Sequence, residues 1–384
     1  MKLSLNWLRE LVDLPDDVEA LCERLTLLGL EVEEVEDFEL AFPGVVVGHV
    51  LEAEQHPDAD RLRVCRVDVG GETLDIVCGA PNVRAGLHVP VATVGSVLPG
   101  DFKLKKGKIR GQVSMGMICS EKELGLGQAA DGIMELSTDT AIGVSFDELY
   151  GIRDTVIEFE VTPNRPDWLS HVGVARELIA HYGGELRLPK VEVDVPVVES
   201  DAGWSIRIDD PTACWRFRGR LIDGVEVGPS PWWMRRRLLA IGQRPINAVV
   251  DASNYVLHEC GHPNHCFDRD KIAGDTVILR RAADGERFTT LDDTDRILTA
   301  EHLLVADADG GMALAGIMGG ADSEVDESTT NLLLEVAVFD PQVVRRGRRA
   351  EVLSTDASYR FERGVDFDLV PWASARLAGL IQEV

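Results

Sequence analysis

The chain carries little positive charge. Its 39 Lys and Arg residues stand against 66 Asp and Glu residues, which gives a formal net charge of −27. A charge of this size keeps a protein soluble and repels nucleic acid on average. A nucleic-acid surface spread over the whole chain is therefore excluded, and any RNA contact needs a local basic patch.

Cysteine is sparse and follows no familiar pattern. The seven cysteines are an odd number, and no Cys-x-x-Cys occurs. This argues against a disulfide framework or a zinc ribbon and favours reduced thiols in the cytoplasm. Cys260 and Cys266 lie near three histidines, but the spacing matches no standard zinc pattern, so we expect no metal site.

Long apolar runs are absent as well. No run approaches the roughly 20 apolar residues that a transmembrane helix requires. The amphipathic start, residues 1–10, has too short an apolar stretch for a signal peptide. We therefore expect a cytoplasmic protein without a membrane partner.

What the chain does contain is enough apolar sequence for several cores. It has 384 residues, 45% of them hydrophobic, which predicts two to four domains. Residues 4–28 predict two helices, the first capped by Ser4 and the second by Asp16 or Asp17. Gly29 is a typical helix stop.

The middle of the chain has a different pattern. Residues 40–151 consist of short β-rich runs separated by Gly, Pro, Asn and Asp, which predicts a small barrel. A predicted strand at 156–161 and a predicted helix from Ser170 to Tyr182 follow, and this mixture of helix and strand resembles that of the N-terminal segment. We predict an α+β multidomain protein in which the barrel is inserted into a small α+β unit and a larger mixed α+β domain follows. The predicted domains are 1–39 with 152–190, 40–151, and 195–384.

A basic patch lies inside the predicted barrel, within eight positions of this acidic chain. Such a patch can neutralise backbone phosphates with an affinity that falls with salt. A solvated hairpin is the alternative. The patch consists of Lys103, Lys105, Lys106, Lys108 and Arg110.

Glu335 interrupts one of the most apolar runs of the chain, residues 332–339. The run predicts a buried strand, where a carboxylate is costly unless it is paired or hydrogen-bonded. Glycines in the upstream segment 315–320 permit a close backbone approach. Together they indicate a pocket with one polar anchor, or alternatively an outward-facing Glu on an edge strand.

Four barrel segments, 56–62, 78–83, 103–111 and 114–125, resemble the tRNA-binding OB domain of the β subunit of bacterial phenylalanyl-tRNA synthetase. Three further segments resemble the same subunit in the same order and spacing, so the resemblance covers essentially the whole chain. They lie at 162–171, 244–268 and 315–364.

The resemblance implies an OB-fold barrel followed by a B3/B4 editing domain, as the N-terminal portion of a longer subunit. It implies two partners, tRNA(Phe) and the α subunit, the latter in a heterotetramer of two α and two β subunits. Phenylalanine activation would belong to the α subunit. ATP and Mg²⁺ are therefore expected for the complete enzyme and no cofactor for this portion.

Editing has a clear physical reason. Tyrosine is phenylalanine plus one hydroxyl, and an apolar pocket rejects an added hydroxyl by only about 10²-fold. A second site must select for that hydroxyl, through a buried polar group that phenylalanine would leave unpaired. The resemblance gives this role to Glu335, as the acceptor of the phenol hydrogen bond, with tyrosine as the ligand.

The resemblance also places His265 and Asn254 at the site of hydrolysis. His265 would orient the ester or the attacking water. Its alternative role is a core histidine bonded to Asp268 or to a backbone carbonyl. No nucleophile–base–acid triad is visible, so a ribose hydroxyl of the tRNA would help to activate the water. Cys266 as a thiol nucleophile is disfavoured. The remaining pocket residues implied are Ser253, Gly316, Gly319, Thr355 and Ala357.

Two other functions are compatible with the sequence. One is a non-catalytic tRNA-binding and assembly module whose pocket is vestigial. The other is a free-standing hydrolase that edits without the α subunit.

Overall fold

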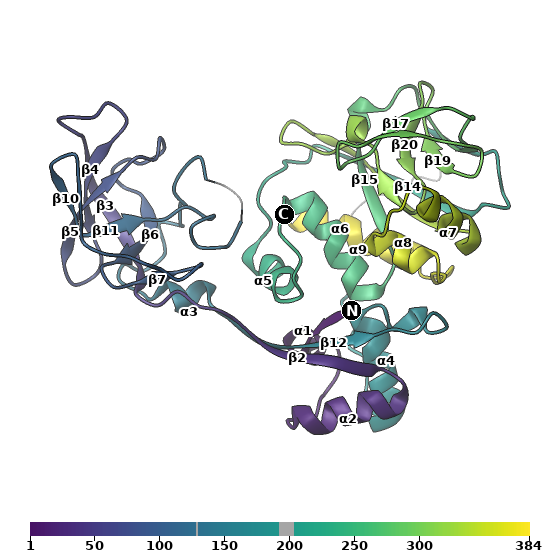
Figure 1. The fold of residues 1–384 in the computed structure, drawn as a ribbon, viewed down its shortest axis with the longest axis horizontal. Helices are drawn as coiled ribbons and strands as arrows, with labels where there is room; N and C mark the ends of the chain where they lie inside the picture. Colours follow the sequence, from purple (N-terminus) through teal and green to yellow (C-terminus); the bar gives the residue numbers. More distant parts are fainter. Residues whose placement is uncertain (128–129, 192–202) are drawn as a thin grey trace. The chain divides into compact units, whose positions relative to one another are not determined.

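The computed structural model describes residues 1–127, 130–191 and 203–384. It divides into two compact units, a larger one of residues 1–36 with 155–384 and a smaller one of residues 37–154 (Figure 1). The predicted α+β class, with a barrel inserted between two parts of the chain, is confirmed. The predicted boundary at 190–195 lies mostly outside the described residues, and the three-domain division stays a prediction.

The N-terminal part of the larger unit forms the elements that its caps predict. The Ser4 hydroxyl accepts a hydrogen bond from the Trp7 amide, the Asp17 carboxylate accepts one from the Ala20 amide, and Gly29 ends the second helix with φ 104°. Ser170 caps the later helix in the same way. The elements are β1 (Lys2–Ser4), α1 (Leu5–Leu11), α2 (Val18–Leu28), β2 (Glu31–Leu40), β12 (Ile152–Glu160) and α4 (His171–Tyr182), and the sheet order is β1-β12-β2.

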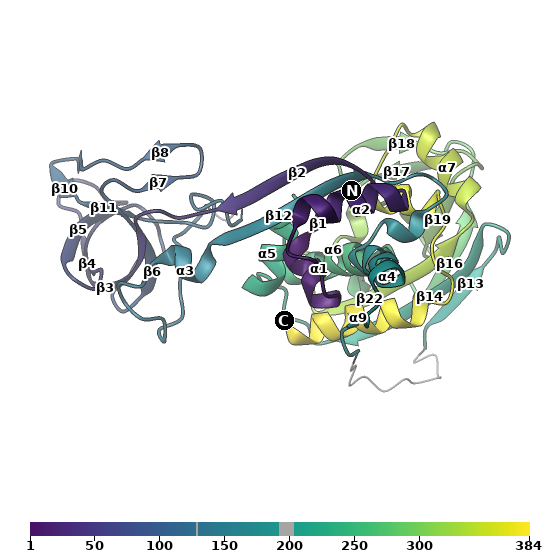
Figure 2. The same cartoon turned by 90° about the horizontal axis from the view of Figure 1, so that it is seen from below.

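The smaller unit is built on a five-stranded sheet of order β11-β6-β3-β4-β5, which Figure 2 shows curling into a barrel. Alternate residues such as Val50, Val67 and Val91 fill its interior. The strands are β3 (Val45–Gln55), β4 (Arg63–Asp68), β5 (Thr73–Cys78), β6 (His88–Thr93) and β11 (Gly116–Ile118). Shorter elements are β7 (Val97–Leu98), β8 (Phe102–Lys103), β9 (Gly107–Ile109), β10 (Gln112–Ser114) and α3 (Phe146–Tyr150).

The C-terminal part of the larger unit contains two sheets, β13-β16-β19-β20-β21 and β14-β22-β15. The first has β13 (Ser205–Ile208), β16 (Thr276–Arg281), β19 (Leu303–Ala306), β20 (Gly311–Leu314) and β21 (Met318–Gly319). The second has β14 (Cys214–Asp223), β15 (Asn264–Asp268) and β22 (Asn331–Phe339). A short pair, β17 (Arg287–Thr289) and β18 (Asp295–Ile297), lies outside both sheets. The helices are α5 (Trp232–Ala240), α6 (Ala248–Cys260), α7 (Pro341–Ala350), α8 (Asp356–Phe361) and α9 (Val370–Glu383).

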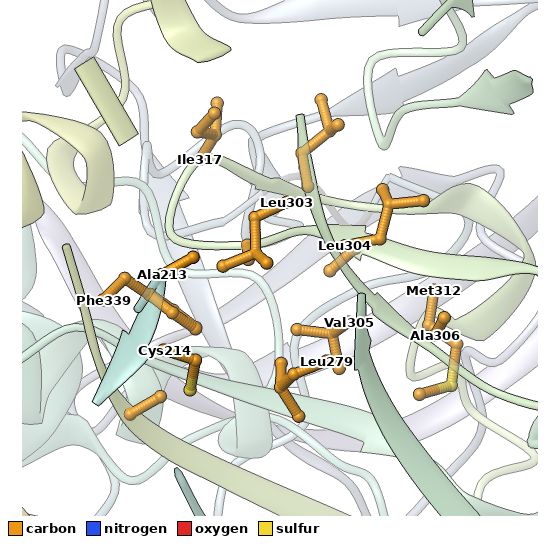
Figure 3. Packing of buried hydrophobic residues seen from close by; sticks show 14 of the residues in the cluster. Ala213, Cys214, Leu279, Leu303, Leu304, Val305, Ala306, Met312, Ile317 and Phe339 are labelled. Atoms are coloured by element: carbon orange, nitrogen blue, oxygen red, sulfur yellow. The ribbon is translucent and has the colours of Figure 1, made fainter. Parts of the chain in front are cut away.

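Strand β22 divides the core of this region. Its residues at 332, 334, 336 and 338 pack into one cluster with α6 and α9, whereas those at 333, 337 and 339 pack into a second cluster with β16 and β19. Figure 3 shows Phe339 and Leu279 within this second cluster. Because side chains alternate along a strand, Glu335 points toward the second face. No helix in the described ranges is long and apolar enough to cross a membrane.

Candidate functional site

One cavity in the larger unit, about 440 Å³ in volume, is lined by α6, β15, β22, residues 313–319 and the start of α8. All eight pocket residues expected from the sequence line it, although they are spread over more than a hundred positions. They are Ser253, Asn254, His265, Gly316, Gly319, Glu335, Thr355 and Ala357. Their roles stay predictions, but their common location is a property of the fold.

Glu335 lies on β22, the middle strand of its sheet, and is only 6% exposed. The alternative of an outward-facing Glu on an edge strand is therefore wrong. Burial alone raises the pKa of Glu335 to about 8. No ion pair or hydrogen bond from the described residues reaches its carboxyl. At neutral pH this carboxyl is mostly protonated, and its hydrogen-bonding capacity is open to a ligand.

His265 on β15 stands directly opposite Glu335 in the antiparallel register. Opposed residues of antiparallel strands project to the same face, so both side chains border the same cavity. Burial lowers the pKa of His265 to about 4, which leaves the imidazole neutral at pH 7. Its Nε2 atom is buried without a hydrogen-bond partner among the described residues.

The alternative role for His265, a core histidine satisfied by Asp268, is wrong. Asp268 instead accepts hydrogen bonds from the Thr329 hydroxyl at 2.7 Å and from the Asp270 amide at 3.0 Å. No carbonyl in the described ranges accepts from the His265 ring either. The ring is therefore held by packing, with polar atoms left for a ligand or water.

The two predicted glycines make room for the protein's own side chains. A Cβ on Gly319 would lie 2.7 Å from Cε1 and 2.9 Å from Nε2 of His265. Gly316 has φ +71°, and a Cβ there would lie 3.0 Å from Phe339 and from Phe361. The sequence predicts a close backbone approach at both glycines, and the side chains that approach them are His265 at Gly319 and Phe339 and Phe361 at Gly316.

Helix α6 supplies one wall of the cavity. Ser253 and Asn254 both line it, and no described group hydrogen-bonds the Asn254 amide. The Ser253 hydroxyl donates to the Asn264 carbonyl at 3.4 Å, and the Asn264 amide donates to the Ser253 carbonyl at 3.2 Å. The Oδ1 atom of Asn264 is buried without a partner among the described residues. Sequence reasoning missed Asn264, and its only signal was its position immediately before His265.

The start of α8 forms another wall of the cavity. The Thr355 hydroxyl caps the helix by accepting from the Ser358 amide at 3.0 Å and donates to the Ile317 carbonyl at 2.8 Å. It therefore ties α8 to the glycine-containing segment. Ala357 is half-buried and packs on the core cluster that contains Phe339.

Cys266 has no nucleophilic role in this arrangement. It packs with Leu334 on the opposite face of the sheet from Glu335, and burial raises the pKa of its thiol to about 12. Within residues 1–127, 130–191 and 203–384, no three His, Cys, Asp or Glu side chains are grouped to hold a metal ion. Around Glu335 and His265, the cavity offers neutral hydrogen-bonding groups in an apolar wall, which suits a ligand with an apolar body and a polar tip.

The basic patch lies in the smaller unit. Lys103, Lys105, Lys106, Lys108 and Arg110 are all exposed. None of them is ion-paired with an acidic residue in the described part of the chain. Part of the patch lies on the antiparallel pair β9–β10, as the hairpin alternative expects. Exposure and free charge are what a phosphate contact requires, but they are also features of a solvated hairpin.

Comparisons with known proteins match two domain families. The "Putative tRNA binding domain" family matches residues 45–145, and the B3/4 domain family matches residues 213–384. The phenylalanine–tRNA ligase β subunits of Oleidesulfovibrio alaskensis and Geobacter metallireducens are each 49% identical over 100% of this chain and 48% of their own length. The chain thus spans about half the length of these relatives.

A solved N-terminal fragment of the phenylalanyl-tRNA synthetase β subunit from Pyrococcus horikoshii aligns more weakly. The alignment covers 48% of this chain and 56% of the fragment, at 18% identity and a TM-score of 0.28. A score this low supports no conclusion about the fold.

Proposed function

Because the chain belongs to the family of phenylalanine–tRNA ligase β subunits, we propose that it is the tRNA-binding and editing portion of such an enzyme. Its cavity hydrolyses tyrosine from wrongly charged tRNA(Phe). The observation that carries this proposal is the Glu335 carboxyl, buried and neutral, without a described partner, directly opposite His265.

Selection of tyrosine follows from the state of Glu335. A tyrosine ring occupies the apolar part of the cavity, and its phenol hydroxyl donates to the Glu335 carbonyl oxygen. Phenylalanine fills the same space but leaves a buried polar group unsatisfied, which costs about 1–3 kcal/mol. The site therefore rejects the correct amino acid, as an editing site must.

Hydrolysis requires water to attack the ester carbonyl carbon and the ribose oxygen to leave with a proton. His265 is neutral, and we assign to one of its ring nitrogens the hydrogen bond from the attacking water. Asn254 lines the cavity from α6, and we assign it the role of orienting the ester. A ribose hydroxyl of the tRNA supplies the remaining proton transfer.

The remaining assignments concern the complete enzyme. The basic patch of the barrel contacts the tRNA backbone, and the chain works beside an α subunit in a heterotetramer in the cytoplasm. ATP and Mg²⁺ serve phenylalanine activation on the α subunit.

The test is tyrosine release from tyrosyl-tRNA(Phe) by the chain and by its Glu335→Ala variant, with Glu324→Ala at the exposed edge of the same cavity as the control. We expect release by the wild type and the control and a loss of at least about tenfold in Glu335→Ala, equivalent to 1.4 kcal/mol. Unchanged release in Glu335→Ala would contradict the proposal. Release no faster than the spontaneous rate in every protein, with the α subunit present, would favour the non-catalytic module.

A further inference from the structure

The outer side of α7 is strongly basic. Four arginines occupy five positions around Gly347, and three of them, Arg345, Arg346 and Arg349, are exposed. Arg345 pairs with the buried Glu362 at 3.9 Å. Arg346 pairs with Glu301 at 3.2 Å, but both of these side chains are more than half exposed, and such pairs hold little energy. Arg349 has no ion pair with a described acidic residue. In a chain of net charge −27, this is a local positive surface.

The inner side of the same helix contacts the wall of the cavity. A Cβ on Gly347 would lie 3.0 Å from Cδ1 of Ile317, a residue that lines the cavity. The next helix, α8, packs against α7 and lines the cavity with Thr355 and Ala357 (Figure 1). The basic face therefore lies on the outer side of α7, and the inner side of α7 packs against the segments that line the cavity.

The turn between the two helices contains an unusual residue. α7 ends with hydrogen bonds from the Val352 amide to the Arg349 carbonyl at 3.3 Å and from the Leu353 amide to the Arg348 carbonyl at 2.8 Å. This is a Schellman motif, in which Val352 holds the position that glycine usually takes. Its φ is +56° and its side chain is 90% exposed.

Valine at this position is unfavourable on two counts. A left-handed backbone is a genuine outlier for a β-branched residue, and an exposed apolar side chain gains nothing from packing. Of the non-glycine residues with positive φ in the described ranges, Asp101, Arg110, Asp293 and Val352, only Val352 is β-branched. Backbone strain of this kind clusters at ligand contacts. The strained valine lies three residues before Thr355 of the cavity.

We propose that the exposed arginines of α7 and Val352 form the docking surface for the single-stranded 3′ segment of the RNA whose amino-acid ester enters the cavity. The arginines contact phosphates, and Val352 contacts the face of a base or a ribose. This inference rests on the proposed editing function and adds the route by which the RNA reaches the site. A nucleic acid is favoured over an acidic protein because the charged face adjoins the cavity in which the ester is bound.

The test is an equilibrium titration of the chain with a 3′-labelled tRNA(Phe) transcript over a range of salt concentrations. Arg346→Gln/Arg349→Gln removes two charges from the surface. Arg176→Gln/Arg207→Gln removes two exposed arginines from α4 and β13 and is the matched control. Two lost contacts to a single strand should lower the slope of log affinity against log salt by about 1.4. The control should keep the wild-type slope. Equal slopes in both double variants would overturn the docking surface.

Val352→Asn separates strain from binding. Asparagine tolerates the left-handed conformation, so the variant should melt at a higher temperature than the wild type yet bind the transcript more weakly. A higher melting temperature with unchanged affinity would overturn the role of Val352. Tyrosine binding measured in the same proteins keeps the two proposals apart. If the variants still prefer tyrosine and bind RNA as the wild type does, only the docking surface is disproved. If the wild type itself does not prefer tyrosine over phenylalanine, the editing function is disproved.

Discussion

Glu335 and His265 lie side by side on adjacent antiparallel strands. Both are uncharged at neutral pH because burial disfavours their charged forms. Two polar groups in one apolar cavity, without a described hydrogen-bond partner, lower the stability of the folded chain. Buried polar groups without a partner persist at binding sites, because there a ligand supplies the missing hydrogen bond.

The stability of the chain should therefore depend on Glu335 and pH. An unfolded glutamate titrates near 4.5, whereas the folded pKa of Glu335 is about 8. Between these values the unfolded chain binds fewer protons than the folded one, so the free energy of unfolding falls as the pH rises. Glu335→Gln should lose this dependence. The difference in free energy of unfolding between Glu335→Gln and the wild type should therefore grow as the pH rises between these two pKa values. It should reach several kcal/mol, since each pKa unit corresponds to about 1.4 kcal/mol.

Urea denaturation at intervals across this pH window measures the effect. Glu324→Gln, which removes an exposed carboxyl at the same cavity, is the control. Parallel pH profiles for Glu335→Gln and the wild type would show that the carboxyl is not desolvated in the folded chain.

Gly319 allows a second prediction at this scale. Gly319→Ala would place its Cβ 2.7 Å from Cε1 of His265, so the ring must move. We expect a loss of about 1–3 kcal/mol in the free energy of unfolding and slower tyrosine release. Gly310→Ala, where nothing lies within 4 Å of the added Cβ, is the control. If both variants unfold at the same urea concentration, the His265 ring does not pack tightly against Gly319.

At the level of secondary structure, the N-terminal cap of α8 connects two walls of the cavity. Thr355 caps α8 and also bonds to the Ile317 carbonyl, so one hydroxyl joins two walls. Thr355→Val should cost about 1–2 kcal/mol of stability, whereas Thr355→Ser should keep most of it. Thermal unfolding of both variants checks this prediction, and equal losses would mean that the hydroxyl does not hold the helix.

The elements themselves were largely predictable from local sequence. Ser4, Asp17, Gly29 and Ser170 set the helix ends because capping depends on neighbouring residues. The buried strand around Glu335 followed from its apolar run. These features need no knowledge of distant parts of the chain.

The site was predictable only in part. Segments far apart were assigned to one pocket through the family resemblance, not through periodicity or spacing. Asn264 was missed because its position depends on the pairing of α6 with β15, and Val352 because no local pattern signals a left-handed valine. The pairing of His265 with Glu335 depends on strand register, which long-range contacts determine.

At the scale of the whole molecule, an acidic chain must bind RNA through local positive surfaces. We propose that the patch of the barrel is one of these. The Lys103→Gln/Lys105→Gln/Lys106→Gln/Lys108→Gln variant should lower the salt slope of tRNA(Phe) binding by up to about 3 if all four contact single-stranded phosphates. Anisotropy titrations at several salt concentrations measure this slope. An unchanged slope would favour the solvated hairpin.

We propose that the cavity distinguishes tyrosine from phenylalanine through one buried carboxyl. The most direct measurement is the ratio of the two dissociation constants, by calorimetry, for the wild type and for Glu335→Ala. The wild type should bind tyrosine more tightly by about 1–3 kcal/mol, the cost of an unsatisfied buried group, and Glu335→Ala should lose the preference. A wild type that binds both amino acids equally, or a variant that keeps the wild-type ratio, would show that Glu335 does not select tyrosine.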